Sequence, residues 1–360
     1  MSEKILPFII PINACYPAIS GASGILFSDP SLHDWMYNNF IQIFEVESNH
    51  ALDYYDFSIE NNPFLSYNEL DFTFIRKNWD SISSFIISSL KDNYYVRLFV
   101  NIEKLPLYPY NQTFYHDLIV FGVNEEASIF HVADHFKNQQ FVKSTCSFSE
   151  LEIALDTFLL SSYDSVPGTL RCAQLIKKDT DFTKLRYSLY TKEQIKSFTS
   201  LNLDRIIKSL SDYITCTPTQ NWYTRGHVMD ENFSATHKWG LDCYDILRLH
   251  IQQVIDTGLP LHFAKQSFYL MYNHKVVMRE RIKILSHIYP SFDMERHLNS
   301  YTKLCVLSKS LMMNFIKFTI KKDKHTNVPR LIDSVRILYN SDYEATQDLL
   351  SNLIKLQTQL

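Results

Sequence analysis

Glycine is scarce in this sequence, with seven residues in 360 where ordinary usage is about 7%. The seven stand at positions 21, 24, 122, 168, 226, 240 and 258, so neither a G-x-G-x-x-G dinucleotide turn nor a G-x-x-x-x-G-K-[ST] phosphate loop can be assembled. No C-x-x-C pair occurs among the six cysteines, which argues against a zinc ribbon and a small disulfide scaffold. These absences exclude the usual nicotinamide, flavin and P-loop ATP chemistries, and they favour a reducing, cytoplasmic location.

A strong charge of either sign is also lacking. The 35 basic residues nearly balance the 39 acidic residues, so we expect no nucleic-acid partner. The uncharged stretch over residues 5–28 is interrupted by Pro7, Pro11 and Pro17, and we therefore expect no membrane segment. A lipidated Cys15 would need a longer apolar run before it than this segment provides.

The pattern of apolar residues changes along the chain. Helical spacing predicts helices over 31–44 and 72–90, and runs of β-branched and aromatic residues predict strands over 94–102, 116–123 and 128–136. From residue 149 onward the apolar residues have helical spacing, which predicts helices over 149–162, 192–215, 241–257, 260–288, 291–321 and 343–358. The sequence therefore predicts an α+β fold class, with a mixed domain, a linker near 160–190 and an all-α domain.

Cys15 is the cysteine whose position suggests chemistry. It lies just before Pro17, and proline suits the first turn of a helix but not its middle. At a helix N-terminus the free N–H groups and the positive end of the dipole favour a thiolate and leave donors for an oxyanion. Free cysteine is otherwise among the most buried residue types, and we assign the other five cysteines to that inert class.

A later hairpin supplies a base and an acid. Strands over 115–123 and 127–136, joined by a three-residue loop, set His116 directly opposite Asp134. Opposed side chains have Cβ atoms about 4.5–5.5 Å apart, close enough for a carboxylate to accept from an imidazole N–H. We therefore predict a catalytic set in which His116 takes the proton of Cys15 and Asp134 orients the imidazole.

Other interpretations of this hairpin exist. His131 and His135, with Asp134 and His116, offer the side-chain types of a metal site. On a strand the first two share one face and Asp134 points to the other, so we expect structural histidines and no metal. Asp117 is an alternative acid, although adjacent strand residues point to opposite faces.

Several segments carry a family resemblance. CYPAISG, the approach YYVRLFVNIEKLPLYPY and the hairpin YHDLIVFGVNEEASIFHVAD are similar to the pattern of C39-like and papain-like cysteine peptidase folds. WGLDCYDILRLHI resembles a helical-domain motif of the butirosin-type acyltransferase family of antibiotic biosynthesis. The resemblance implies a papain-like catalytic domain over 1–158 and a helical domain over 159–360 that serves as substrate lid or docks a carrier protein.

The resemblance further implies amide formation in thiotemplated, nonribosomal biosynthesis. An acyl chain on the phosphopantetheine of an acyl or peptidyl carrier protein would pass to Cys15 and then to a small amine, with no bound cofactor. A narrower resemblance implies aroyl-β-alanyl chains and a small diamine. Papain-like enzymes place a glutamine six residues before the cysteine for the oxyanion, where this chain has Ile9. Asn13 is our candidate oxyanion donor, and a turn residue bonding its own backbone is the other interpretation.

Lysines gather at the end of the helix predicted over 291–321, namely Lys317, Lys321, Lys322 and Lys324. Basic residues favour helix C-termini and are usually solvated, while a docking patch for an acidic carrier protein is the functional interpretation. Three classes of function stay open at this point. They are a thioester-to-amine acyltransferase, a cysteine peptidase or amidohydrolase with the same triad, and a module without catalysis.

Overall fold

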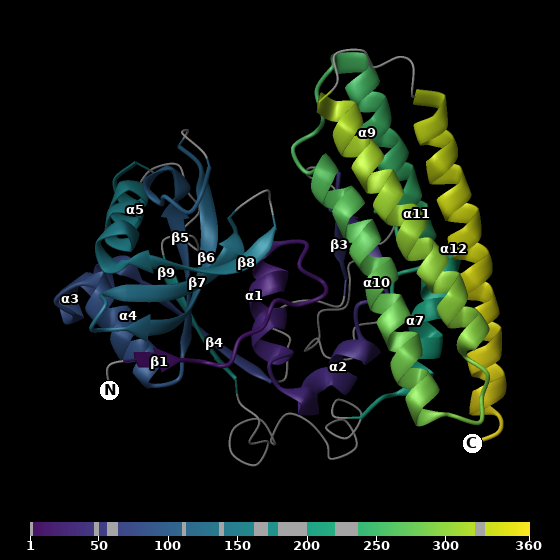
Figure 1. Ribbon diagram of the computed structural model, residues 1–360, viewed down its shortest axis with the longest axis horizontal. Helices are drawn as coiled ribbons and strands as arrows, with labels where there is room; N and C mark the ends of the chain where they lie inside the picture. The colour runs from purple at the N-terminus through teal and green to yellow at the C-terminus, as the bar shows by residue number, and fades with distance from the viewer. Residues whose placement is uncertain are drawn as a thin grey trace. The chain divides into compact units, whose positions relative to one another are not determined.

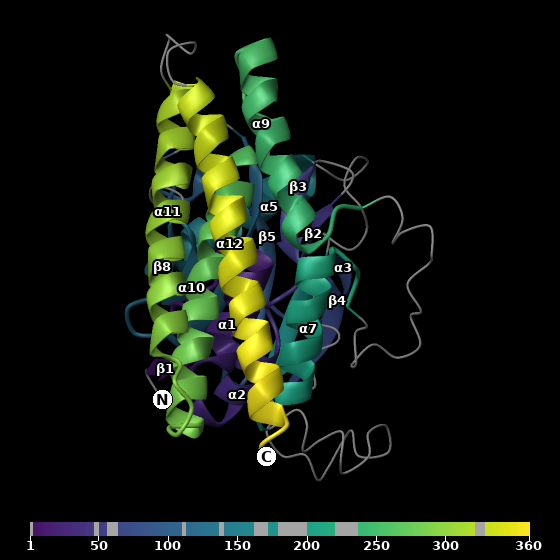
Figure 2. The ribbon, with the colours of Figure 1, turned by 90° about the vertical axis from the view of Figure 1, so that its right-hand side faces the viewer.

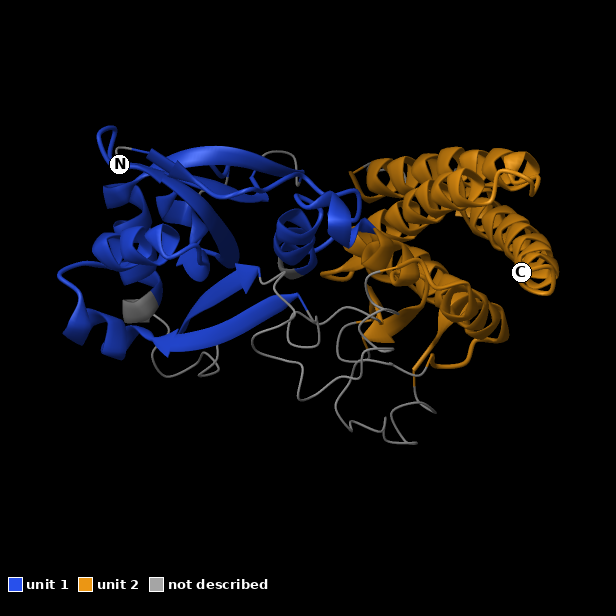
Figure 3. Cartoon of the chain, turned by 90° about the horizontal axis from the view of Figure 1, so that it is seen from below, with its two compact units in different colours: residues 1–33, 58–191 blue, residues 34–57, 192–360 orange. Residues whose placement is uncertain are grey.

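The computed structural model describes residues 3–46, 50–55, 64–109, 113–136, 140–161, 172–178, 200–219, 237–320 and 328–360. The fold is α+β, with an antiparallel sheet region in the N-terminal half and a run of long helices in the C-terminal half (Figure 1). The chain divides into two compact units, residues 1–33 with 58–191 and residues 34–57 with 192–360 (Figure 3).

The first unit is built on a seven-stranded antiparallel sheet. Its strands are β1 (Glu3–Ile5), β4 (Leu65–Asp71), β5 (Tyr95–Asn101), β6 (Tyr115–Asn124), β7 (Ile129–His135), β8 (Phe141–Ser147) and β9 (Cys172–Lys178). Along the sheet they follow the order β4-β9-β5-β6-β7-β8, and β1 pairs with the last residues of β6. Strand β9 therefore belongs to the sheet, within the segment that the sequence suggested as a linker.

Helices cover both faces of this sheet. They are α1 (Pro17–Leu26), α3 (Phe72–Asn78), α4 (Ile82–Lys91) and α5 (Phe148–Ser161), with short 3-10 turns over Pro30–Leu32 and Ile102–Lys104. Helix α1 packs on β6 and β7, where Gly21 lies against the side chain of Ile119. On the other face Phe130 of β7 contacts Phe148 at the start of α5, with ring centroids 4.4 Å apart.

The single helix predicted over 72–90 is two helices. Asp71 caps the first by accepting from the backbone N–H of Thr73, and the chain is extended at Trp79. Ser81 then starts the second helix through a reciprocal capping box with Ser84. The apolar spacing continues across the break, but the cap residues stop and restart the backbone hydrogen bonds.

The second unit is mainly helical. It contains α2 (His33–Asn38), the hairpin of β2 (Ile43–Val46) and β3 (Ala51–Tyr54), α7 (Leu203–Thr215), a 3-10 turn over Gly240–Asp242, α9 (Cys243–Thr257), α10 (Ala264–Ile288), α11 (Glu295–Ile320) and α12 (Val328–Gln357). Helices α10, α11 and α12 pack as successive neighbours (Figure 2). Pro329 lies in the first turn of α12, where it is tolerated, so this helix starts well before the predicted residue 343.

Residues 34–57 join the helices, although the sequence placed them in the first domain. The predicted helix over 31–44 ends at Asn38, where buried Arg281 of α10 donates to the carbonyl of Tyr37 in the last turn and to that of Asn39 just beyond it. His274 of α10 likewise donates to the carbonyl of Ile41 over 2.8 Å. Residues 192–199 of the predicted helix 192–215 lie outside the described residues.

Within the described ranges, no helix has an apolar stretch long enough to cross a lipid bilayer.

Candidate active site

The hairpin of β6 and β7 brings His116 and Asp134 together, as predicted, although the predicted register is wrong. The loop has four residues, 125–128, so that Asn124 pairs with Ile129. That loop alone would move the two side chains to opposite faces, because the side-chain period of a strand is two. An irregularity in β6 between Val120 and Gly122 then shifts the pairing by one residue, and the two corrections restore the shared face.

The two side chains meet diagonally instead of directly. Ile119 pairs with Ala133, so continuing the register sets Leu118 opposite Asp134. His116 is two residues further along the same face, and its Nδ1 lies 2.6 Å from Asp134 Oδ2. A diagonal neighbour in an antiparallel pair is still within reach of a long or aromatic side chain.

Electrostatics favour the charged forms of both groups in this contact. Burial alone would lower the pKa of His116, but the hydrogen bond and charge of Asp134 raise it above the ordinary value. Burial alone would raise the pKa of Asp134, yet the hydrogen bond from His116 and the charges of His116 and His135 hold it below the ordinary value. Because Nδ1 of His116 is engaged, Nε2 is the nitrogen left for chemistry, on a side chain that is 26% exposed.

Tyr108 is a third member of this group that sequence reasoning missed. Its buried hydroxyl donates to Asp134 Oδ2, the oxygen that His116 contacts. The ring also packs against Phe136, with centroids 5.0 Å apart. The prolines on either side of Tyr108 in the sequence indicate an irregular segment, but no local pattern reveals that its hydroxyl reaches a carboxylate on β7.

Cys15 lies in the loop directly before α1, as predicted. Tyr16 is the N-cap residue of this helix, Pro17 occupies its first turn, and the Tyr16 side chain makes no capping hydrogen bond. The N–H groups of the first turn are thus not capped by Tyr16, which makes them candidate oxyanion donors. The Cys15 side chain is only 3% exposed. The preceding residue, Ala14, contacts His135 at the end of β7, with its carbonyl oxygen 3.3 Å from Nε2.

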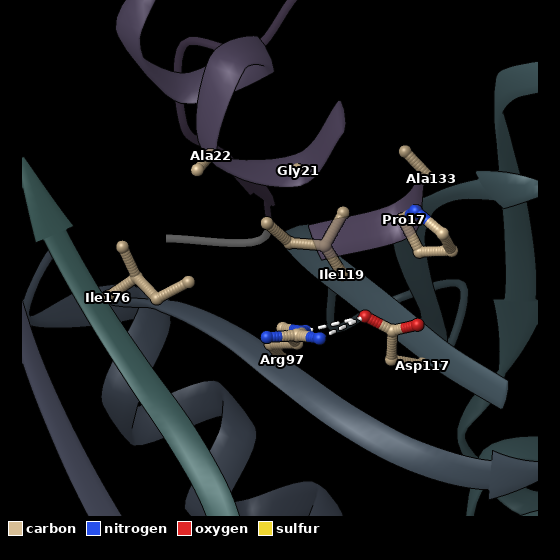
Figure 4. Close-up of a pocket in the computed structure, with 8 residues that line it drawn as sticks. All are labelled: Pro17, Gly21, Ala22, Arg97, Asp117, Ile119, Ala133 and Ile176. Atoms are coloured by element: carbon tan, nitrogen blue, oxygen red, sulfur yellow. Dashed lines mark hydrogen bonds and ion pairs between the residues drawn. The ribbon is translucent and has the colours of Figure 1, made fainter. Parts of the chain in front are cut away.

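The two faces of the sheet carry different parts of the predicted set. Pro17 of α1 lines a small pocket with Ile119, Ala133 and the ion pair of Arg97 and Asp117 (Figure 4). Adjacent residues of β6 point to opposite faces, so His116 and Asp134 belong to the face away from α1. The contact between Ala14 and His135 places the loop of Cys15 at the same end of the sheet as the His116–Asp134 pair, on the other face.

The carboxylate of Asp117 is already engaged. Its Oδ2 accepts from Arg97 Nε over 2.6 Å, and Arg97 also donates to Gln174 of β9. This arrangement leaves Asp134 as the acid in contact with His116.

Asn13, the candidate oxyanion donor, is fully buried. Its side-chain amide donates to Ser23 Oγ of α1 over 3.1 Å, and its Oδ1 has no hydrogen-bond partner among the described residues. The contact to Ser23 fixes the loop before α1 from the inside, which fits a structural amide. The N–H groups at the start of α1 are the other candidate donors for an oxyanion at Cys15.

The structure also places the other features that the sequence suggested, namely His131, the helical motif around Trp239 and the lysines at the end of α11. His131 Nε2 lies 3.5 Å from Glu3 of β1, apart from the His116 contact. In the part of the chain that the structure describes, no group of three or more His, Cys, Asp or Glu side chains is arranged to hold a metal ion. Trp239 of the helical motif stacks on Phe44 within the second unit. Of the lysines predicted to dock a carrier protein, Lys317 is exposed on α11, and Lys321, Lys322 and Lys324 lie outside the described residues.

No family model matches the chain, and a comparison with curated proteins finds no relative.

The contacts around Asp134 predict an order of effects for substitutions. His116→Ala should lower the predicted acyl transfer by about 10⁶-fold and Asp134→Asn by about 10⁴-fold, because an orienting acid supports the base without taking the proton. Asp117→Asn is the matched control on the same strand, and it should leave the rate close to that of the parent protein. If Asp134→Asn left the rate unchanged while Asp117→Asn lowered it strongly, Asp117 on the other face of the sheet would be the orienting acid.

The ion pair also predicts a pH dependence of stability. The raised pKa of His116 stabilises the fold below about pH 6.5, and this contribution is lost as the pH rises through the folded-state pKa. The lowered pKa of Asp134 stabilises it above about pH 3.9, with loss as the pH falls through the folded-state value. Urea unfolding of the parent and of Asp134→Asn should therefore differ most between these limits, and a gap that widens above pH 7 would contradict the assignment.

Proposed function

We propose that this protein is a cysteine-dependent acyltransferase with a papain-like catalytic unit, which forms an amide from a carrier-protein thioester and an amine. The observation that carries the proposal is the part-buried His116–Asp134 hydrogen bond at the end of the sheet where Cys15 precedes α1. A nucleophile before a helix, a base and an orienting acid are the parts that covalent acyl transfer needs. Each part comes from a different element of the first unit.

The reaction divides into two acyl transfers. Cys15 as thiolate attacks the thioester carbonyl, and the bond to the phosphopantetheine sulfur breaks as that thiol leaves with a proton from His116. The acyl group is then held on Cys15. An amine attacks this carbonyl, gives its proton to His116 and displaces the Cys15 thiolate, so that amide and free enzyme result. Asp134 keeps Nδ1 of His116 protonated, which leaves Nε2 to carry the moving proton.

The substrate supplies the only prosthetic group in this scheme. The phosphopantetheine arm belongs to an acyl or peptidyl carrier protein, so the proposed partners are that protein and a small amine, in the cytoplasm. An aroyl-β-alanyl chain and a small diamine, the substrates of the amide synthetase of the closthioamide pathway, are the particular pair that we propose. Lys317 and the lysines that follow it are the proposed contact for an acidic carrier.

Loading of Cys15 tests this proposal directly. The full-length protein is mixed with the pantetheine thioester of benzoyl-β-alanine, and intact mass and peptide mapping locate the adduct. Cys172 and Cys216 are the more exposed cysteines, but burial raises the pKa of both, that of Cys216 to about 11. Both are therefore thiols near neutral pH, and we expect the adduct on Cys15 despite its burial. An adduct spread over several cysteines, or none, would refute the proposal.

The ratio of amide to free acid formed from acyl-Cys15 distinguishes a transferase from a hydrolase. Amine and water compete for the acyl-Cys15 carbonyl, and an amine transferase must hold its acceptor close and exclude water. We expect the amide to dominate when 1,3-diaminopropane is supplied at saturating concentration. Free acid as the main product under the same conditions would show a cysteine hydrolase built on the same three residues.

A further inference from the structure

His135 is the second imidazole that approaches Asp134. Its Nδ1 lies 3.5 Å from Asp134 Oδ1, while His116 contacts the other oxygen of the same carboxylate. Its Nε2 lies 3.3 Å from the carbonyl oxygen of Ala14, the residue before Cys15. The ring packs edge-on against Phe141 of β8 and is mostly buried. One side chain thus spans the space between the predicted acid and the loop of the predicted nucleophile.

From this geometry we propose that His135 is a positioning residue, which ties the loop carrying Cys15 to the carboxylate of Asp134. The inference rests on the proposed function of Cys15. It gives the two faces of the sheet a physical connection, because His135 shares the α1 face with Ala133 while Asp134 shares the other face with His116. The chain of contacts runs from Ala14 through His135 and Asp134 to His116.

Counting donors shows what this link requires. Both partners of His135, the Ala14 carbonyl and the Asp134 carboxylate, are acceptors, and a neutral imidazole has a single N–H. Among the described residues, Asp134 Oδ1 and His135 Nδ1 are both buried without a hydrogen-bond partner. A doubly protonated ring that closes the 3.5 Å gap by a few tenths of an ångström would satisfy both atoms and still donate to Ala14.

The charged groups described near this ring are Asp134, Asp117, Arg97 and Lys143. Asp134 is beside it on β7, and Asp117 on the same face of β6 is neutralised by Arg97. Lys143 of β8 lies on that face too, but its ammonium donates to the carbonyl of Phe8. Asp134 is therefore the carboxylate that His135 approaches, and it is shared with His116.

The test compares three variants of the full-length protein. His135→Phe keeps an aromatic ring against Phe141 and removes both donors, while His135→Gln restores one donor for the Ala14 carbonyl. His131→Phe is the matched control, since it lies on the same strand and face but contacts Glu3. The readout is the alkylation rate of Cys15 by iodoacetamide, measured by peptide mapping between about pH 5 and 9. Melting temperatures report on the fold.

In His135→Phe we expect about tenfold slower alkylation of Cys15 near pH 7, with the midpoint of the pH profile moved up toward about 8.5, the value of an ordinary cysteine. His135→Gln should recover part of the rate, and His131→Phe should match the parent protein. An unchanged profile in His135→Phe, or an equal loss in His131→Phe, would overturn the proposal. A lower melting temperature with an unmoved midpoint and no recovery by glutamine would assign His135 a structural role only.

This measurement is independent of the acyl-transfer assay, because alkylation needs neither thioester nor amine. If Cys15 fails to accept an acyl group, the proposed function fails while the effect of His135 on the thiol is still measured. If His135 has no effect, Cys15 loading still decides the function.

Discussion

Cys15→Ala should abolish acyl transfer and leave the fold intact. Removing the nucleophile of a catalytic triad costs about 10⁶-fold in rate elsewhere, because the covalent intermediate can no longer form. The substitution deletes one sulfur atom from a side chain in the loop before α1, which is fixed separately by the Asn13–Ser23 and Ala14–His135 contacts. The measurement is amide formation from the pantetheine thioester and diamine, together with the melting temperature.

Cys146→Ala is the matched control for this variant. Cys146 is equally buried in the first unit, and burial raises its pKa to about 12, so it is an inert thiol at neutral pH. We expect parent-like turnover from this control. Turnover retained in Cys15→Ala would remove Cys15 from the mechanism, whatever the state of His116 and Asp134.

Asp342→Ala should cost about 3–5 kcal/mol of folding free energy, the largest stability effect that we expect from a single substitution. Asp342 of α12 and Lys275 of α10 form an ion pair of 2.6 Å in which both side chains are 0% exposed. Tyr213 and Tyr244 also donate to the same carboxylate oxygen. Removing the carboxylate leaves a buried ammonium without its counter-charge and two buried hydroxyls without their acceptor.

Two further variants are controls for the Asp342→Ala prediction. Arg336→Ala removes an exposed pair with Asp333 on the same helix, and it should change stability by less than about 1 kcal/mol. Combining Asp342→Leu with Lys275→Met replaces the buried pair by apolar side chains, and this combination should recover much of the loss. Urea unfolding measures all of them. A cost below about 1 kcal/mol for Asp342→Ala would mean that water or neutralisation of Lys275 relieves the charge.

The buried network around Asp342 also shows what sequence patterns do not predict, namely which charged residues of a helix are buried. Tyr213, Lys275 and Asp342 come from three helices. The apolar spacing predicted a helix at Tyr213 and at Lys275, whereas Asp342 lies just before the helix predicted over 343–358. Burial lowers the pKa of Lys275 despite the attraction of Asp342. A lysine or aspartate in a helical stretch is ordinarily solvated, so no single-helix pattern distinguishes these residues from their exposed neighbours.

In the candidate site, too, the sequence predicted some features, and the tertiary structure decided the others. The residue types of β6 and β7 predicted two strands, and the turn residues predicted that they form a hairpin. The register depended on the length of the loop and on the irregularity before Gly122. At Gly122 strand β1 approaches so closely that a Cβ would lie 2.9 Å from the carbonyl oxygen of Lys4. Pairing with a strand at the start of the chain is a tertiary effect, which the hairpin sequence does not contain.

By itself the sequence determined most of the local elements and the residue types that meet in the candidate site. Helical periodicity, β-branched runs, proline positions and the cysteine before Pro17 all act within a few residues, and the structure has helices, strands and a helix N-terminus there. Only the tertiary structure decided which distant segments join. It added β9 to the sheet, moved residues 34–57 to the helices through Arg281 and His274, and brought Tyr108 and His135 to Asp134. The physical reason is that such contacts arise from the burial of complementary surfaces and the satisfaction of buried polar groups, which depend on residues far apart in the chain.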